Sequence, residues 1–475
     1  MYNEKYLKDI INLFLEKYSN QEAFMFYKEK ELCSISFLKL GQDILRAAGF
    51  LKQNKIEKKH IALAAKNSYE WYIVFFAAVL TGNVVVLIDE NLPAGEIMYR
   101  IRYADVNYIF CEDDIAENFR EDTVIRLPWE NFFQGEKFSL DEIYRWKKDE
   151  LMCLLFTSGT LGKNKAVMLS ARNMQICMSD LMDQFKVKKT LLILPLYHIG
   201  GLGGTLYLLA GGKTVCIGRG MKYFFQDLSS MNPNHIMMVP GIMDNLVRIL
   251  KKHPDKEDRQ KYIGKELKYL GVGGAVSKEE VCRYLIKEGF QLSTGYGLSE
   301  TAGIGMMGKM TEDRLKSIGQ IEDGMKCRIE NKEILLSGDA VMLGYYKDPE
   351  ATQKAVRDGW LYTGDLGYLD EAGWYYLMGR KKNVIILSNG ENVSPEQLEE
   401  ILNQSKAIKE CMVYSIPKGI CADIYTEEQE KAKRYIEEYN LGVPTYRQII
   451  HVNYSDVPLE KTESGKIKRK ENQYE

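Results

Sequence analysis

The sequence predicts an α/β protein with a large N-terminal domain of parallel-rich αβα layers, a small β unit and a small α+β C-terminal domain. Three observations predict this organisation. Apolar strand-like runs alternate with helical runs through the first three quarters of the chain. From about residue 320 the pattern changes to alternating strands joined by tight turns. After Gly379 a polar run leads into a tail of roughly 90 residues, which is the size of a domain.

The large domain is predicted from a regular succession of strands and helices. An apolar run precedes a helix that carries Trp71 and Phe75 and ends at Gly82, and a further strand follows it. A later helix is expected near residues 204–210. The expected strands are residues 61–65, 84–88, 190–195, 213–217, 235–240, 267–273 and 290–297. Continuous apolar strands separated by helices are typical of parallel sheets that are covered on both faces.

The two smaller units are predicted from turns and caps. Residues 327–345 and 359–380 alternate in polarity around tight turns at Asn331-Lys332 and Asp370–Gly373, which favours a small antiparallel unit. In the tail, Ser394-Pro395-Glu396 is the pattern that opens a helix.

Composition excludes several classes of protein. At 475 residues the chain is too long for one core. A formal charge of −2 gives no reason to expect nucleic acid or an acidic membrane surface as a partner. The nine cysteines show no C-x-x-C spacing, so neither a zinc site nor a disulfide framework is indicated. The longest apolar stretch is interrupted at Thr81-Gly82-Asn83, and the N-terminus lacks the features of a signal peptide. A cytoplasmic protein without a membrane span is expected.

A loop rich in hydroxyls, glycines and lysines follows the apolar run Leu154–Phe156. Glycine backbone amides, hydroxyl donors and an ammonium group are the components of phosphate-binding loops. The sequence Asn164-Lys165-Ala166 excludes a Walker A loop. An ordinary solvated turn is the alternative interpretation. The candidate phosphate-binding residues are Thr157, Ser158, Gly159, Thr160, Gly162 and Lys165.

Four further stretches bear on phosphate binding. Residues 293–303 place Tyr296 between glycines, where it can lie against a planar ligand, and follow it with Glu300, which can hold a magnesium ion. In residues 362–367, Asp365 can accept hydrogen bonds from vicinal hydroxyls. Residues 379–400 contain a basic turn, and residues 458–470 place a lysine after a glycine. Taken singly, each stretch also has an ordinary structural explanation: a packed tyrosine, a tight turn or a row of solvated lysines.

The order and spacing of the motifs resemble those of the ANL superfamily of adenylate-forming enzymes, which includes acyl-CoA synthetases, nonribosomal-peptide adenylation domains and luciferases. The succession is TSGTLGKNKAV, PLYHIGG, GVGGA, YGLSETAG, YTGDLGY, GRKKNVI and SGKIKR, and it runs from about residue 60 to residue 470. The resemblance implies a domain of residues 1–379, a hinge at 380–382 that includes Lys382, and a small mobile domain of residues 383–475.

The resemblance also implies a role for each matching residue. The loop from Thr157 to Lys165 would hold the β- and γ-phosphates of ATP. Glu300 would hold Mg²⁺, and Thr301 would contact the α-phosphate. Lys466 would bridge the acyl carboxylate and the α-phosphate. Adenine and ribose would be bound by Gly274, Ala275, Thr294, Tyr296, Gly297, Asp365 and Arg380. Asn389 and Gly390 would form the loop that reaches the site in the thiol-transfer step.

The loop also departs from the family pattern. Leu161, Asn164 and Ala166 stand where the family usually has threonine, proline and glycine, which would weaken ATP binding without abolishing it. The C-terminal domain also lacks a loop between Tyr414 and Thr426 that many relatives have.

The predicted reaction activates a fatty or aryl carboxylic acid with ATP and transfers it to coenzyme A. Residues 194–204 lack the aspartate with which amino-acid-activating relatives pair the substrate ammonium, and His198 stands where acyl- and aryl-CoA synthetases have histidine or an aromatic residue. Glycines at positions 201, 203 and 204, together with Gly303 and Gly305, leave room for an apolar acyl group. Two alternatives stay open at this point, an enzyme that loads a phosphopantetheine carrier protein and a weakly active nucleotide-binding regulatory relative. The acid, the pathway and the oligomeric state are not specified by these motifs.

Overall fold

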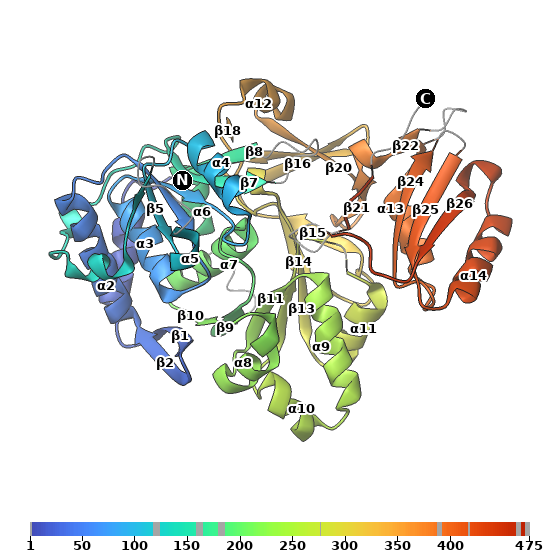
Figure 1. Cartoon of the computed structure of the whole chain (residues 1–475), viewed down its shortest axis with the longest axis horizontal. Coiled ribbons are helices and arrows are strands. Elements are labelled where there is room, and N and C mark those ends of the chain that lie inside the picture. Colours follow the sequence, from blue (N-terminus) through green and yellow to red (C-terminus); the bar gives the residue numbers. More distant parts are fainter. Residues whose placement is uncertain are drawn as a thin grey trace. The chain divides into compact units, whose positions relative to one another are not determined.

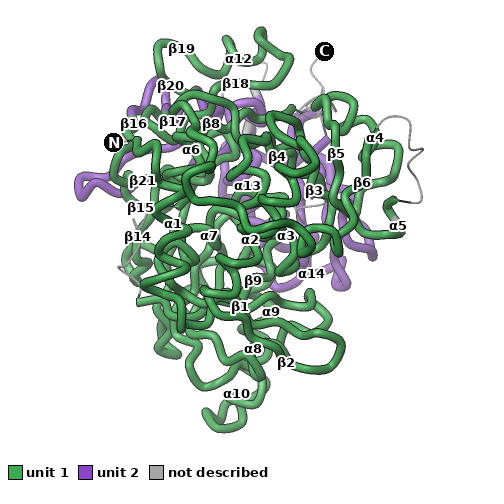
Figure 2. The backbone as a smooth tube through the Cα atoms, turned by 90° about the vertical axis from the view of Figure 1, so that its left-hand side faces the viewer, with its two compact units in different colours: residues 1–327, 336–361 green, residues 328–335, 362–475 purple. Residues whose placement is uncertain are grey.

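The computed structural model describes residues 2–116, 124–157, 165–178, 186–275, 277–386, 392–416, 419–461 and 467–470. The chain forms two compact units, coloured separately in Figure 2. Unit 1 consists of residues 1–327 and 336–361, and unit 2 of residues 328–335 and 362–475. Unit 2 therefore combines part of the predicted β unit with the predicted C-terminal domain. The boundaries predicted at 379 and 383 stay predictions.

One sheet of unit 1 has the strand order β18-β8-β7-β4-β3-β5-β6. The strands from β7 to β6 in this order run parallel, and β8 is antiparallel to both of its neighbours. In chain order the bounds are β3 (His60–Ala64), β4 (Val84–Leu87), β5 (Tyr108–Cys111), β6 (Ile125–Arg126), β7 (Leu151–Thr157), β8 (Lys165–Ser170) and β18 (Gly344–Tyr345).

The helices of the first half of unit 1 contribute an extensive core. Residues 71–80 are all buried within α3, because this helix is apolar on every side. The bounds are α1 (Tyr6–Leu15), α2 (Phe37–Gln53), α3 (Tyr69–Leu80), α4 (Ala94–Tyr103), α5 (Asp113–Ala116) and α6 (Ala171–Cys177), with short 3₁₀ helices η1 (Trp129–Gln134) and η2 (Leu140–Glu142).

A second sheet also runs through unit 1. Its strands in this unit have the order β15-β14-β13-β12-β11-β9-β10-β1-β2. The strands from β13 to β1 run parallel, and the outer strands β2, β14 and β15 are antiparallel. The bounds are β1 (Glu22–Lys28), β2 (Glu31–Ser36), β9 (Lys189–Leu192), β10 (Thr214–Ile217), β11 (His235–Met238), β12 (Tyr269–Val272), β13 (Gln291–Tyr296), β14 (Met306–Lys309) and β15 (Ser317–Ile321).

Helices pack against this sheet and bury apolar side chains between themselves and the strands. Leu246 and Leu250 of α9 and Leu285 of α11 pack with Leu270 and Leu292 of the strands, and α9 and α11 lie side by side along it (Figure 1). The bounds are α7 (Ile199–Ala210), η4 (Met221–Tyr223), α8 (Phe224–Met231), α9 (Pro240–Lys252), α10 (Lys256–Ile263), α11 (Glu279–Lys287), η5 (Ser299–Thr301) and α12 (Pro349–Ala355).

The predicted β unit is formed by β16 (Met325–Glu330), β17 (Glu333–Gly338), β19 (Val356–Arg357), β20 (Trp360–Leu369) and β21 (Tyr375–Arg380). β20 is antiparallel to β19 and β21. The turn between β16 and β17 places Asn331 and Lys332 at φ angles of 50° and 66°, the left-handed conformation that tight hairpins require. The predicted antiparallel unit and this turn are confirmed.

The tail of unit 2 has its own core, made by Ile385, Leu398, Val413 and Ile424 among others. Helix α13 begins at Pro395, as predicted. The bounds are η6 (Lys381–Asn383), β22 (Ile385–Ile386), β23 (Asn392–Val393), α13 (Pro395–Leu402), β24 (Glu410–Ile416), β25 (Gly419–Tyr425), α14 (Gln429–Leu441), η7 (Thr445–Arg447) and β26 (Ile449–Ser455). Across the described ranges, none of the helices combines the length and the apolar character needed to span a bilayer.

A buried histidine lies inside unit 1. His235 begins β11, and its Nδ1 lies 2.8 Å from the hydroxyl of Thr190 on the neighbouring strand β9. Burial lowers the pKa of His235 from its usual 6.5 to about 4, because a charged imidazolium loses its hydration inside the core. The imidazole is therefore neutral at neutral pH.

This histidine makes stability depend on pH. Since the unfolded chain binds the proton at a higher pH, the stability is fully present above pH 6.5 and is lost as pH falls toward 4. We expect the free energy of unfolding to lose up to about 3 kcal/mol over this range through His235 alone. Denaturant unfolding of the wild type and His235→Leu at pH 7 and 4.5 measures it. An equal loss in the two proteins would contradict the assignment.

Candidate active site

The carboxyl ends of β12 and β13 bring the predicted adenine-binding residues together. The two strands are parallel, with Val272 opposite Thr294, so the segments that follow them leave the sheet at the same edge. A side chain at Gly273 would lie 3.5 Å from the carbonyl oxygen of Gly295, which shows how closely the two segments approach. The predicted residues at this edge are Gly274, Ala275, Thr294, Tyr296 and Gly297.

The turn after β13 carries Glu300 and Thr301 and is tightly closed. A side chain at Gly297 would collide with the carbonyl oxygen of Gly303. Ala302, which is buried, has a φ of 52°, a left-handed conformation that is strained for a residue with a side chain. The Thr301 hydroxyl is buried and bonds to the backbone of Leu298 at 3.1 and 3.2 Å. In this structure Thr301 thus holds the turn that presents Glu300.

Glu300 is linked to the predicted phosphate-binding loop through Tyr345. The Tyr345 hydroxyl donates to Glu300 Oε1 at 2.8 Å, and the Glu300 carbonyl accepts from Met342 N at 2.8 Å. The Nζ of Lys165 lies 4.4 Å from the centre of the Tyr345 ring. One tyrosine therefore contacts both a predicted phosphate-binding lysine and the predicted metal-binding carboxylate.

The donor set around Glu300 fits a magnesium ion that arrives with a nucleotide. Among the described residues no group of three or more His, Cys, Asp or Glu side chains is placed to hold a metal ion. Mg²⁺ commonly binds through one or two carboxylates together with substrate phosphates and waters. A single carboxylate beside a lysine-bearing loop is consistent with that mode.

Only the two ends of the phosphate-binding loop are described. Thr157 ends β7 and Lys165 begins β8, and the two residues are opposite each other in the antiparallel pair. The Thr157 hydroxyl lies 3.5 Å from the carbonyl oxygen of Lys165. This pairing brings both ends of the loop to one sheet edge. The predicted residues Ser158, Gly159, Thr160 and Gly162 lie outside the described residues.

His198 stands at the start of α7, and this helix packs against the Glu300 turn. The His198 carbonyl accepts from Gly201 N and Leu202 N, both at 3.0 Å, which starts the helix. A side chain at Gly303 would lie 3.3 Å from Ile199 Cγ1, and Cys177 Sγ lies 3.3 Å from the carbonyl oxygen of Ala302. The structure thus places the predicted acyl-site helix beside the predicted nucleotide-binding turn.

Unit 2 holds the predicted ribose-binding pair. Asp365 of β20 and Arg380 of β21 are opposite each other in the ladder, and Arg380 Nε lies 2.6 Å from Asp365 Oδ1. Arg380 also donates to the carbonyl oxygen of Thr363 at 3.1 Å. The Asp365 side chain is only 7% exposed, whereas that of Arg380 is 42% exposed. The predicted cooperation of these two residues is consistent with this contact.

Some of the remaining predicted site residues of unit 2 lie outside the residues that the structure describes. Lys382 lies in η6, directly after β21. Lys466, Asn389 and Gly390 lie outside the described residues. The chain just beyond Lys466 is anchored, because Arg469 donates from both terminal nitrogens to the two carboxylate oxygens of Glu399, at 2.9 and 2.6 Å.

Two family models match the chain. A model described as AMP-binding enzyme matches residues 13–346, and one described as AMP-binding enzyme C-terminal domain matches residues 382–475. The chain belongs to the AMP-binding enzyme family. The predicted superfamily is therefore confirmed.

Similar curated proteins are CoA ligases. A long-chain-fatty-acid–CoA ligase of Bacillus subtilis (strain 168) is 27% identical over 492 residues, which cover 90% of this chain and 85% of the relative. A 2-succinylbenzoate–CoA ligase of Listeria monocytogenes serovar 1/2a is 25% identical over 470 residues, covering 95% and 96%. The expected enzyme class, an AMP-forming acid–thiol ligase, is confirmed by these matches.

Solved structures share the fold. O-succinylbenzoate coenzyme A synthetase from Bacillus subtilis, in complex with ATP and magnesium ion, aligns with a TM-score of 0.82 at 21% identity, covering 98% of each chain. ATP-bound MatB from Rhodopseudomonas palustris aligns with a TM-score of 0.83 at 20% identity, covering 97% of each chain. The predicted α/β fold with a large and a small domain is confirmed, with mixed sheets.

Sequence reasoning did not identify Tyr345, whose role depends on a contact between distant residues. Tyr345→Phe should raise the Mg²⁺ concentration needed for half-maximal adenylation about tenfold, because a hydrogen bond to a charged group contributes about 1.5–3 kcal/mol. Pyrophosphate release against Mg²⁺ measures it. Tyr346→Phe is the matched control, since the Tyr346 hydroxyl bonds to Asp105 instead. Equal titrations for both variants would contradict a role for Tyr345.

Proposed function

We propose that this protein joins a fatty or aryl carboxylic acid to coenzyme A through an acyl adenylate. The observation that carries the proposal is the contact series Lys165–Tyr345–Glu300 beside helix α7, which follows His198. It joins a cation for phosphates, a carboxylate for a metal and a helix for the acyl group within unit 1. The family's chemistry needs these three parts in one place.

The first step requires positive charge near the attacking oxygen. A carboxylate that attacks the α-phosphorus of ATP brings two anions together, so cations must neutralise charge that grows in the transition state. Lys466 would supply one cation to the carboxylate and the α-phosphate. Mg²⁺, when bound with ATP at Glu300, supplies charge neutralisation to the phosphates. Asp365 would accept hydrogen bonds from the ribose hydroxyls, with Arg380 holding its carboxylate in place.

The glycines around α7 differ in the room they leave. A side chain at Gly201 would collide with the Pro195 carbonyl oxygen, and one at Gly305 would lie 2.6 Å from the Tyr296 carbonyl oxygen. These two glycines permit close backbone contacts, so the expectation that they leave room for an acyl group is wrong. A side chain at Gly204 meets no atom within 4 Å, and one at Gly203 makes only an ordinary contact of 3.7 Å. We therefore assign the acyl space to the Gly204 side of α7.

The experiment measures each half-reaction separately. Pyrophosphate release across a panel of fatty and aryl acids tests adenylation, and the acyl adenylate is then offered to coenzyme A and to a phosphopantetheine carrier protein. We expect AMP and the acyl-CoA thioester. Transfer to the carrier protein alone would favour a carrier-loading enzyme. Nucleotide binding without pyrophosphate release from any acid would favour a regulatory protein.

A further inference from the structure

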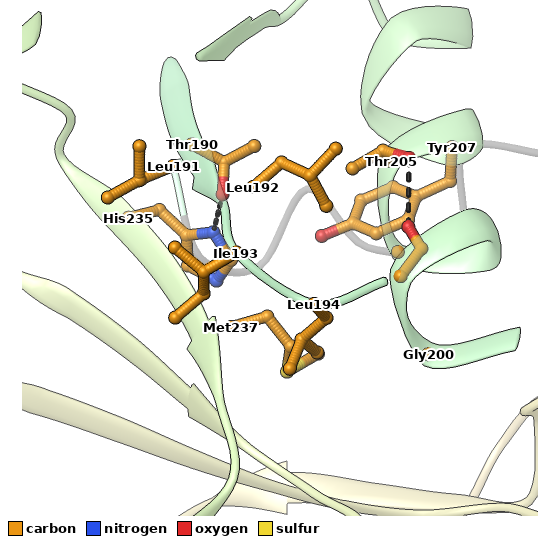
Figure 3. A pocket seen from close by; sticks show the side chains of 12 residues that line it. Thr190, Leu191, Leu192, Ile193, Leu194, Gly200, Thr205, Tyr207, His235 and Met237 are labelled. Atoms are coloured by element: carbon orange, nitrogen blue, oxygen red, sulfur yellow. Dashed lines mark hydrogen bonds between the residues drawn. The ribbon is translucent and has the colours of Figure 1, made fainter. Parts of the chain in front are cut away.

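A small cavity opens beside α7 within unit 1. It lies between α7, strand β9 with the residues that follow it, and strand β11, and its volume is about 10 Å³, the room of roughly one water molecule. Figure 3 shows Thr205 and Tyr207 lining it from the helix, and His235 and Met237 from the strand. Leu191, Leu192, Ile193 and Leu194 supply an apolar wall.

One face of α7 leads along this cavity. Gly200, Gly204 and Tyr207 are spaced four and three residues apart, so they share a face of the helix. Side chains at Gly200 and Gly204 would have almost no close neighbours, the nearest being Leu194 Cδ1 at 4.0 Å from Gly200. From Gly200 to Tyr207 the helix rises roughly 10 Å. This face therefore lines the cavity from Gly200 to Tyr207.

The cavity contains an unused hydrogen-bonding group. His235 is 6% exposed, and its Nδ1 lies against the Thr190 hydroxyl at 2.8 Å (Figure 3). Among the described residues, the other ring nitrogen, Nε2, has no hydrogen-bond partner. A side chain on residue 271 would lie 3.4 Å from Nε2, so Gly271 leaves this nitrogen uncovered. Nε2 is not one of the fully buried atoms that lack a partner, so it is open to the cavity, where a water molecule or a ligand oxygen can hydrogen-bond it.

We propose that this cavity receives the far end of the acyl substrate and that His235 Nε2 hydrogen-bonds a neutral oxygen there, a hydroxyl or a ketone. This inference rests on the proposed function and narrows its substrate class. The preferred acid is a fatty or aryl acid that carries an oxygen substituent at the end remote from its carboxylate. His235 is then a residue that determines specificity.

The surroundings of His235 favour a neutral oxygen over a methyl group or a carboxylate. A methyl group would displace a water that can hydrogen-bond Nε2 and would leave this nitrogen without a partner, which costs binding energy. A carboxylate would have to give up its hydration inside an apolar wall. The imidazole is neutral there and would not repay that cost as an ion pair.

Matched acids test the inference. Hexanoate, octanoate and decanoate are compared with their omega-hydroxy counterparts and with the dicarboxylates of the same lengths, and para-methylcinnamate is compared with para-hydroxycinnamate. For the best length, we expect kcat/KM for pyrophosphate release to favour the hydroxy acid over the methyl-ended acid by about tenfold, the value of one well-formed hydrogen bond to a buried group. Calorimetric binding of the same acids should show the same order.

Variants of His235 then test whether this histidine causes the preference for the hydroxy acid. His235→Leu should remove the preference or reverse it, with activity toward the methyl-ended acid retained, and His235→Asn should retain part of it because the amide can still donate. Thermal unfolding of each variant controls for the fold. A preference that persists in His235→Leu, or equal kcat/KM values in the wild type, would overturn the inference while leaving the proposed function intact. Absence of pyrophosphate release with every acid would instead refute the proposed function, and the inference with it.

Discussion

Lys466→Ala should slow acyl-adenylate formation by about 10²-fold or more, the scale of losing one transition-state electrostatic donor. Thioester formation from preformed adenylate should change far less, because the resemblance assigns Lys466 to the first step only. Described residues on either side of Lys466 make ionic contacts: Lys461 pairs with Glu410, and Arg469 makes its two-point contact with Glu399. The two half-reactions are timed separately on one preparation.

Lys468→Ala provides the matched control. This lysine lies two residues from Lys466 in the same tail, its side chain is half exposed and it pairs with Glu460. We expect both half-reactions of the control to stay close to those of the wild type. If Lys468→Ala slowed adenylation as much as Lys466→Ala, general loss of positive charge from the tail would replace the specific role of Lys466.

Gly297→Ala should also reduce adenylation by about 10²-fold or more, because a displacement of catalytic groups by about 1 Å can cost that much. The added methyl group would meet the backbone oxygen of Gly303, and backbone cannot rotate away as a flexible side chain can. The turn between them would have to open, and it carries Glu300. Pyrophosphate release and its Mg²⁺ dependence measure the effect.

Gly295→Ala, two residues earlier and within β13, separates this local effect from a general intolerance of this segment to substitution. Its added methyl group would lie 3.9 Å from the nearest atom, the Met306 carbonyl oxygen, which is an ordinary contact. Its adenylation rate and thermal midpoint should stay near those of the wild type. If both variants lost activity to the same degree, the close approach of Gly297 and Gly303 would not be the cause.

Local patterns were sufficient to predict most elements. The alternation of apolar strands with helices predicted β3, α3, β4 and β9 to β13 at nearly their observed places, because burial on both faces imposes a recognisable period. The hairpin at Asn331-Lys332 and the start of α13 were predicted for the same kind of reason, since turn and cap preferences act over a few residues. The antiparallel strands β2 and β8 were not specified, because pairing direction depends on distant partners.

By itself, the sequence determined the family, the fold class and the types of residue at the site. Glu300, Asp365 and Arg380 could be named because each lies in a short motif whose spacing is readable along the chain. The tertiary structure alone decided what those residues contact. Tyr345 reaches Glu300 across 45 positions, and Thr190 meets His235 across the same separation. Which glycine faces open space and which meets backbone was likewise decided by packing, because steric room is a property of neighbours that are close in space and distant in sequence.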